Sequence, residues 1–229
     1  MDAVVMAAGE GRRLRPLTEV WPKPVLPIAG RPVIATLLRE LASAGFDEVT
    51  VVTGHLAEQT ETLLGDGAGF GLRIRYTRQP EPLGSADAVR CAFEAGVRPP
   101  LLVLAADTVF ASGDLSRLAQ LPKGTTAALG VRPSTDSEKT PVTVRNGLVT
   151  GIGEGEGELR AAPLWILGEE IVASLRELSG PPFELAAALR KAISDGKEVV
   201  AVKLGPTRDL TRPEDVVSHN FPYLSKDGK

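Results

Sequence analysis

The chain has 229 residues, of which 43% are hydrophobic, so it can bury a core and is not a disordered chain. Its formal net charge is -3, from 26 basic and 29 acidic residues, and this near balance gives no sign of the basic surface that a nucleic-acid-binding domain needs. No apolar run is long enough to cross a membrane, no signal-peptide pattern is present, and the single Cys91 excludes an internal disulfide. We therefore expect a cytoplasmic protein without nucleic-acid or membrane partners.

The first half of the chain alternates short apolar runs with longer amphipathic stretches. Strands are expected at residues 3–6, 49–53, 72–76 and 101–105, and helices at residues 32–44, 56–64 and 85–95. The strand at 101–105 is apolar throughout, as in a strand that is buried on both faces. Strands separated by helices in this way predict an α/β fold with a doubly wound, mostly parallel, Rossmann-like sheet.

Beyond about residue 125 the expected strands follow one another closely. They lie at residues 125–131, 141–145, 148–152 and 163–167, followed by helices at 169–178 and 183–195 and a last strand at 199–204. Asn146-Gly147, between two strand-forming runs, predicts a tight hairpin. We interpret residues 1–229 as one domain with a core at 1–124, a small β-rich insertion at 125–170 and a C-terminal part at 171–229.

A glycine-rich loop, residues 7–13, follows the first strand directly. Gly9 and Gly11 allow the backbone to adopt positive φ and to approach a ligand, and successive N–H groups in such a turn can bind an anion. A dinucleotide fingerprint would need a third glycine where Leu14 stands and an acidic residue at the end of the second strand. The lysine of a P-loop is also absent from the loop. An NAD-dependent enzyme is therefore disfavoured.

Four cations follow closely on Gly9, namely Arg12, Arg13, Arg15 and Lys23. Guanidinium groups bind phosphate oxygens in a bidentate manner, so the loop and the cations together favour a triphosphate site. The alternative, a tight turn with solvated arginines, stays open on the residues alone.

The stretch MAAGEGRRLRPLTEVWPKPVLPI, residues 6–28, resembles the signature of the sugar-1-phosphate nucleotidyltransferases, such as glucose-1-phosphate thymidylyltransferases and mannose-1-phosphate guanylyltransferases. The resemblance implies that Ala8, Gly9 and Gly11 bind the base and the phosphates of the nucleotide. It also implies that Arg13 and Lys23 act in catalysis on the triphosphate. The prolines around Lys23 restrict their own φ and the residues before them, which holds the lysine in an extended segment.

Three further segments are similar to motifs of the same family. In residues 79–86, the resemblance implies that Gln79 reads the nucleobase and that Gly84 lets the base or ribose lie against the backbone. Asp107 follows a buried strand, and Asp209 lies in a segment like the family's late aspartate motif, without the aromatic residue expected before it. The resemblance implies that both carboxylates bind Mg²⁺, which prefers hard oxygen ligands that it shares with phosphates.

The acceptor side of the expected site is weakly marked. Glu154 lies where the family carries an E-K-P-like segment that contacts the sugar, but no lysine follows it. Asp114, Glu214 and Asp215 stand at expected helix starts and are interpreted as structural.

The resemblance implies transfer of a nucleoside monophosphate from a nucleoside triphosphate to a sugar 1-phosphate, giving an NDP-sugar and pyrophosphate. These two substrates are the expected partners, and a homo-oligomer stays open. One alternative is a cytidylyl-type transferase with a non-hexose acceptor, such as inositol phosphate, phosphocholine or an amino sugar phosphate. Another is a catalytically silent relative that binds nucleotide for regulation, which the presence of Arg13, Lys23 and Asp107 disfavours.

Overall fold

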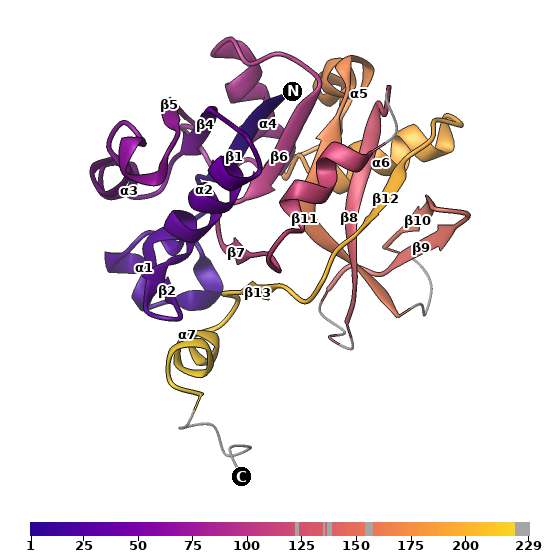
Figure 1. Ribbon diagram of the computed structural model, residues 1–229. Coiled ribbons are helices and arrows are strands. Elements are labelled where there is room, and N and C mark those ends of the chain that lie inside the picture. Colours follow the sequence, from indigo (N-terminus) through magenta and orange to yellow (C-terminus); the bar gives the residue numbers. More distant parts are fainter. Residues whose placement is uncertain (122–123, 135, 137–138, 154–157, 223–229) are drawn as a thin grey trace.

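The structure, a computed structural model, describes residues 1–222 except 122–123, 135, 137–138 and 154–157. A nine-stranded mixed sheet, in the order β5-β4-β1-β6-β11-β8-β12-β10-β9, runs through the molecule (Figure 1). Helices pack on both of its faces through two large apolar clusters. The predicted α/β class is therefore confirmed.

One half of the sheet is parallel and is built from the first part of the chain. Its strands are β1 (Asp2–Ala7), β4 (Glu48–Thr53), β5 (Arg73–Arg78) and β6 (Leu101–Ala105). The helices between them are α2 (Val33–Ser43), α3 (Ala57–Leu64) and α4 (Ser85–Glu94). The alternation of strands and helices expected here is confirmed.

Helix α2 shows why these segments fold as they do. Ile34, Leu37, Leu38 and Leu41 recur at helical spacing and are fully buried in the cluster on one face of the sheet. Burial of such a side chain contributes about 1.5–3 kcal/mol relative to leaving it exposed, so this stripe docks the helix. Gly45 adopts a φ of +91° directly after the last turn and ends it.

The other half of the sheet begins with β11 (Leu159–Leu167), which is antiparallel both to β6 and to β8 (Ala127–Pro133). β12 (Val200–Lys203) is parallel to β8, and β10 (Leu148–Ile152) and β9 (Val142–Arg145) complete this end of the sheet. The strands of the β-rich stretch thus continue the main sheet and share its core.

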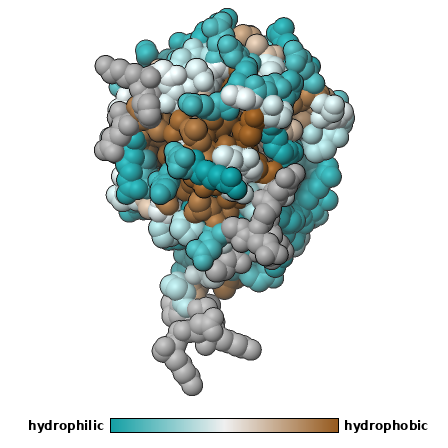
Figure 2. Space-filling model, turned by 90° about the vertical axis from the view of Figure 1, so that its right-hand side faces the viewer, coloured by the Kyte–Doolittle hydropathy of each residue, from teal (hydrophilic) through white to brown (hydrophobic). Residues whose placement is uncertain are grey.

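The hairpin of β9 and β10 has the turn that its sequence predicts. Asn146 has a φ of 50° and Gly147 a φ of 80°, and positive values at both central positions define a type I′ turn. The twist of such a turn matches that of the paired strands. Seen from this end of the molecule, apolar residues gather in the middle of the face and hydrophilic residues surround them (Figure 2).

Strand direction decides which loops meet. Because β11 is antiparallel to both β6 and β8, the strands β8 and β12 run in the same direction as β1, β4, β5 and β6. The carboxyl ends of these strands therefore lie along one edge of the sheet. Ligands of open α/β sheets bind at this edge.

Short elements complete the fold. They are α1 (Leu17–Val20), the pair β2 (Pro27–Ile28) and β3 (Arg31–Pro32), and the pair β7 (Thr108–Val109) and β13 (Arg208–Asp209). The last helices are α5 (Glu169–Ser174), α6 (Leu185–Ser194) and α7 (Pro213–Asn220). α5 and α6 share a cluster with α4, on the face opposite to α2. Within the described ranges, no helix is long and apolar enough to span a membrane.

Candidate active site at the carboxyl edge of the sheet

The glycine-rich loop leaves β1 at the carboxyl edge and lines a cavity of about 320 Å³. Gly11 has a φ of +61°, and a Cβ there would lie 2.9 Å from the Thr18 side chain, so the turn requires glycine. The Thr18 hydroxyl donates a hydrogen bond to the Gly11 carbonyl at 2.9 Å. No described atom lies within 4 Å of the place where a Cβ of Gly9 would stand. Gly9 therefore leaves its backbone open to a ligand.

The four cations predicted near this loop have different surroundings. Arg12 donates a hydrogen bond to Glu10 at 2.7 Å, and Arg15 lies 3.4 Å from the same carboxylate. The hydrogen bond from Arg12 is the main reason why the pKa of Glu10 lies below its usual value. Arg12, Arg13 and Lys23 line the cavity. The cavity therefore has a positively charged wall, as a triphosphate site requires.

A second cavity of about 250 Å³ adjoins the first, and both are lined by Met6 and Gly9. Its lining includes the predicted nucleotide residues Ala8, Gln79 and Gly84. Gln79 is buried, and its Nε2 donates to the Gly84 carbonyl at 3.0 Å and to Asp87 at 2.8 Å. The structure thus brings the predicted nucleotide residues together and holds the Gln79 amide in one orientation.

Gly84 has a packing requirement in addition to the role that the resemblance implies. Its φ is +115°, and a Cβ there would lie 2.4 Å from the carbonyl oxygen of Phe183. The Phe183 N–H donates to the Leu83 carbonyl at 2.7 Å, and the Ala86 N–H donates to the Phe183 carbonyl at 2.8 Å. This close backbone approach ties the start of α4 to the segment that leads into α6.

The pairing of β7 with β13 brings the segments of the two predicted metal aspartates together at this edge. Asp107 directly precedes β7, and the antiparallel register places Asp209 opposite Thr108. Each carboxylate is paired with a lysine. Lys23 Nζ contacts Asp107 Oδ2, and Lys139 Nζ contacts Asp209 Oδ2.

Asp209 is held by more than one group. Arg132 Nη2, at the end of β8, lies 3.6 Å from Asp209 Oδ1, and the Thr211 hydroxyl donates to Oδ2 at 3.2 Å. Burial raises the pKa of Asp209, but the hydrogen bond from Lys139 and the charges of Lys139 and Arg132 outweigh it and hold this pKa below its usual value. Asp209 is therefore an ionised carboxylate in a largely buried site.

Sequence reasoning did not find Lys139 or Arg132. Lys139 stands in a polar connection between β8 and β9, where a lysine carries no signal of its own. Arg132 could have been noticed, because a charged residue that ends an apolar strand run usually has a partner. Glu154, the residue predicted for the acceptor, lies outside the described residues.

The chemistry of the two predicted metal ligands suits a divalent cation. Asp107 and Asp209 offer hard oxygen donors, and Mg²⁺ is usually bound by one or two carboxylates together with substrate phosphates and water. Among the residues that the structure describes, no cluster of three His, Cys, Asp or Glu side chains forms a closed metal cage. An ion at this place would therefore depend on substrate phosphates for part of its coordination.

Asp114 and Asp215 both have structural roles, although Asp114 makes no capping hydrogen bond to the helical turn that follows it. Asp114 is fully buried and accepts a hydrogen bond from the Gly205 N–H at 3.0 Å. Asp215 accepts one from the Thr211 N–H at 2.7 Å and caps α7. Because Gly205 and Thr211 flank Asp209, these bonds fix the segment that carries it.

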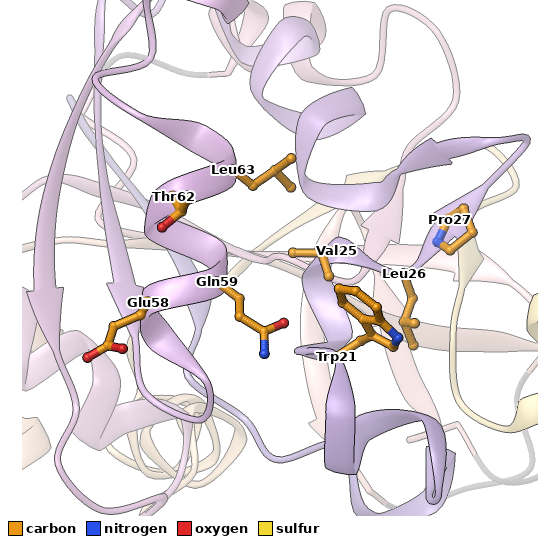
Figure 3. Close-up of a pocket in the computed structure, with 8 residues that line it drawn as sticks. All are labelled: Trp21, Val25, Leu26, Pro27, Glu58, Gln59, Thr62 and Leu63. Carbon is orange, nitrogen blue, oxygen red and sulfur yellow. The ribbon is translucent and has the colours of Figure 1, made fainter.

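An apolar groove of about 670 Å³ lies beside the segment that carries Lys23. Gln59 and Leu63 of α3 stand on one side of it, and Trp21 and Val25 on the other (Figure 3). Trp21 is 55% exposed and Leu63 44% exposed. The residues that line the groove include none of the predicted site residues. The predicted nucleotide-binding residues instead line the two smaller cavities at the carboxyl edge.

Known proteins share this sequence pattern. Residues 2–145, more than half of the chain, match the model of a family described as nucleotidyl transferase. A low-salt glycan biosynthesis nucleotidyltransferase of Haloferax volcanii is 26% identical over 96% of this chain and 65% of its own length. An N-acetylmuramate α-1-phosphate uridylyltransferase of Neisseria meningitidis is 45% identical over 38% of this chain and 37% of its own length. The matches thus span less than two thirds of either relative.

The fold also has counterparts among solved structures. A Bacillus anthracis chain described as a glucose-1-phosphate thymidylyltransferase has a TM-score of 0.86 and 19% identity, with 99% of this chain and 96% of that chain covered. Such a likeness confirms the predicted nucleotidyltransferase-like fold. With the family match over residues 2–145, it leads to one conclusion. The chain belongs to the nucleotidyl transferase family.

Proposed function

We propose that this chain transfers a nucleoside monophosphate from a nucleoside triphosphate to a sugar 1-phosphate and releases pyrophosphate. One observation carries the proposal: Arg13, Lys23 and Asp107 line one cavity with the glycine loop at the carboxyl edge of the sheet. The β7–β13 pairing brings the segment of Asp209 next to that of Asp107. The names of two similar proteins support the acceptor class, because N-acetylmuramate 1-phosphate and glucose 1-phosphate are both sugar 1-phosphates.

In this proposal the nucleotide occupies the two adjoining cavities. The base lies in the cavity of Ala8, Gln79 and Gly84, and the triphosphate lies against Gly9 and Gly11. Arg13 and Lys23 neutralise its negative charge from the wall of the first cavity. The open space at Gly9 supports this placement, because phosphate oxygens need close access to backbone N–H groups.

The reaction requires charge neutralisation and alignment more than covalent chemistry by the protein. An oxygen of the acceptor phosphate attacks the α-phosphorus and forms a new P–O bond. The bond from the α-phosphorus to the oxygen that bridges to the β-phosphorus breaks, and its electron pair leaves with pyrophosphate. Lys23 stabilises the negative charge that develops on the α-phosphate. Mg²⁺, bound by Asp107 and Asp209, would supply the positive charge that lets two anionic substrates approach.

The test is a matrix of five nucleoside triphosphates against a panel of phosphate acceptors, with pyrophosphate release measured in the presence of Mg²⁺. The panel holds several sugar 1-phosphates, inositol phosphate, phosphocholine and an amino sugar phosphate. We expect release with at least one sugar 1-phosphate, its loss on addition of a chelator, and its return with excess Mg²⁺.

Three results would contradict the proposal in different ways. Release with the non-sugar acceptors alone would point to the cytidylyl-type alternative. Thermal stabilisation by a triphosphate, with no release for any acceptor, would point to a silent nucleotide-binding relative. Stabilisation by NAD and by none of the triphosphates would exclude a triphosphate site.

A further inference from the structure

The carboxyl edge of the sheet carries positive charges at some distance along the sheet from the predicted nucleotide-binding residues. The predicted nucleotide residues follow β1, β5 and β6, on one side of β11. Arg132 and Lys139 come from the end of β8 and from the connection after it, on the other side of β11. Both nevertheless reach Asp209, so two cations meet one carboxylate and leave a surplus positive charge at this point.

These two cations are not ordinary surface charges. The Lys139 side chain is 22% exposed and the Arg132 side chain is 10% exposed. Nε of Arg132 is buried and has no hydrogen-bond partner among the described residues. Buried polar groups are nearly always hydrogen-bonded, and an ordered lysine loses considerable side-chain entropy. A buried surplus of positive charge is therefore costly unless an anion compensates it.

We infer that Lys139 binds the phosphate group of the acceptor. The inference rests on the proposed function, which requires a second anionic substrate beside the nucleotide. An acceptor phosphate would place its negative charge where Lys139 and Arg132 exceed the charge of Asp209. Lys139 has three N–H donors on a flexible stem, so it can turn from the carboxylate to a phosphate oxygen when a cation takes up Asp209. In this arrangement Lys23 binds the phosphates of the nucleotide, and Lys139 binds the phosphate of the acceptor.

The experiment compares Lys139→Met, which removes the charge and keeps the length, with Lys139→Arg, which keeps the charge. The matched control is Lys191→Met on α6, where an exposed lysine pairs with Asp195 at 2.8 Å, away from the edge. Pyrophosphate release is measured with the acceptor varied at saturating nucleotide, and then with the nucleotide varied at saturating acceptor. The loss of one charge-assisted hydrogen bond should raise the KM for the acceptor about ten- to hundredfold.

The expected pattern separates a phosphate ligand from a structural residue. Lys139→Met should leave the KM for the nucleotide unchanged, Lys139→Arg should restore most of the acceptor KM, and Lys191→Met should behave as the wild type. Thermal unfolding of each variant shows whether the fold is intact. A raised KM for the nucleotide alone, or unchanged acceptor KM in Lys139→Met, would overturn the inference.

A calorimetric titration separates this inference from the proposed function. The sugar 1-phosphates of the panel are added to protein that is saturated with Mg²⁺ and an α,β-methylene triphosphate, which cannot react. If the wild-type protein binds a sugar phosphate but never releases pyrophosphate from a reactive triphosphate, the proposed function is refuted. The role of Lys139 can then still be tested by comparing the affinities of the wild type and Lys139→Met for the sugar phosphate. Binding of equal strength in wild type and Lys139→Met, or no binding of any sugar phosphate to the wild type, would refute the role of Lys139.

Discussion

Lys23 and Asp107 form a largely buried ion pair at the mouth of the loop cavity. In the absence of ligand, each charge is compensated by the other. Neither side chain is therefore an unpaired charge in the largely buried site, which would be costly. When substrate binds, this ion pair would separate: Lys23 would bind a phosphate and Asp107 would bind the metal ion. The ion pair therefore holds both side chains in position at the cavity.

At the residue scale, Lys23→Met and Asp107→Asn should each lower turnover about 10²–10³-fold, because each removes a charge that is aimed at the reacting phosphates. The control is Lys197→Met, which removes an exposed lysine 2.7 Å from Glu170 on the surface. Turnover is measured by pyrophosphate release, and circular dichroism checks the fold. Turnover within a fewfold of the wild type in both site variants would remove these residues from the mechanism.

Glu40 on α2 is a second residue whose charge is set by its surroundings. Burial, and then the charge of Asp114, raise its pKa from the usual 4.5 to about 7, against a lowering by Arg208. The folded chain thus binds this proton more tightly than the unfolded chain does. Its contribution to stability is full below pH 4.5 and is lost as the pH rises through about 7.

Glu40→Gln should remove this pH dependence, because the amide cannot ionise. At pH 5 the variant and the wild type should have similar free energies of unfolding. At pH 8 the variant should be more stable by about 1–2 kcal/mol, allowing for solvent screening at this partly exposed position. Urea unfolding at a series of pH values between 5 and 8 measures the difference. A difference that stays constant across the series would contradict the assignment.

At the element scale, the junction of α4 and α6 depends on one backbone position. Gly84→Ala would place a methyl group 2.4 Å from the Phe183 carbonyl at a φ of +115°. The strain and the overpacking should together lower the free energy of unfolding by about 2–4 kcal/mol. Gly9→Ala is the matched control, because open space surrounds its Cβ position. It should change stability by less than about 1 kcal/mol but raise the KM for the nucleotide.

Urea unfolding and nucleotide kinetics on both glycine variants separate the two effects. If Gly84→Ala unfolds as the wild type does, the close approach to Phe183 does not hold the junction together. If Gly9→Ala leaves the KM for the nucleotide unchanged, phosphates do not lie against that backbone.

The elements themselves were largely predictable, because their signals are local. Apolar spacing predicted α2, and Asn146-Gly147 predicted the β9–β10 hairpin, within a residue or two. Two elements differ more: β11 begins at Leu159 rather than at the predicted Pro163, and the helix predicted at 169–178 is α-helical only to Ser174. Proline lacks the N–H that a central strand donates, which favours it at a strand start. The structure accommodates Pro163 with a shift of register between Ala161 and Trp165.

At the scale of the whole molecule, the predictable part of the site is the part carried by continuous motifs. The glycine loop and Asp107 lie directly after strands, so the parallel arrangement alone brings them to one edge. The meeting of Lys139 with Asp209 joins residues 70 positions apart. It depends on β13 crossing back to pair with β7, and no local pattern encodes such a crossing. The contact between Lys139 and Asp209 could therefore not be predicted from the sequence.

The central place of β11 also bears on how the chain is made. β6 is buried from Leu101 to Leu104, yet 53 residues separate its end from the start of one of its two neighbours, β11. At a synthesis rate of about 5–20 residues per second, the ribosome needs roughly 3–12 seconds to supply β11. During that time the parallel half of the sheet in the nascent chain has an unpaired, apolar edge along β6. Such an edge can pair with a strand of another chain. Until β11 emerges, this edge of β6 is therefore a place where the nascent chain can pair wrongly.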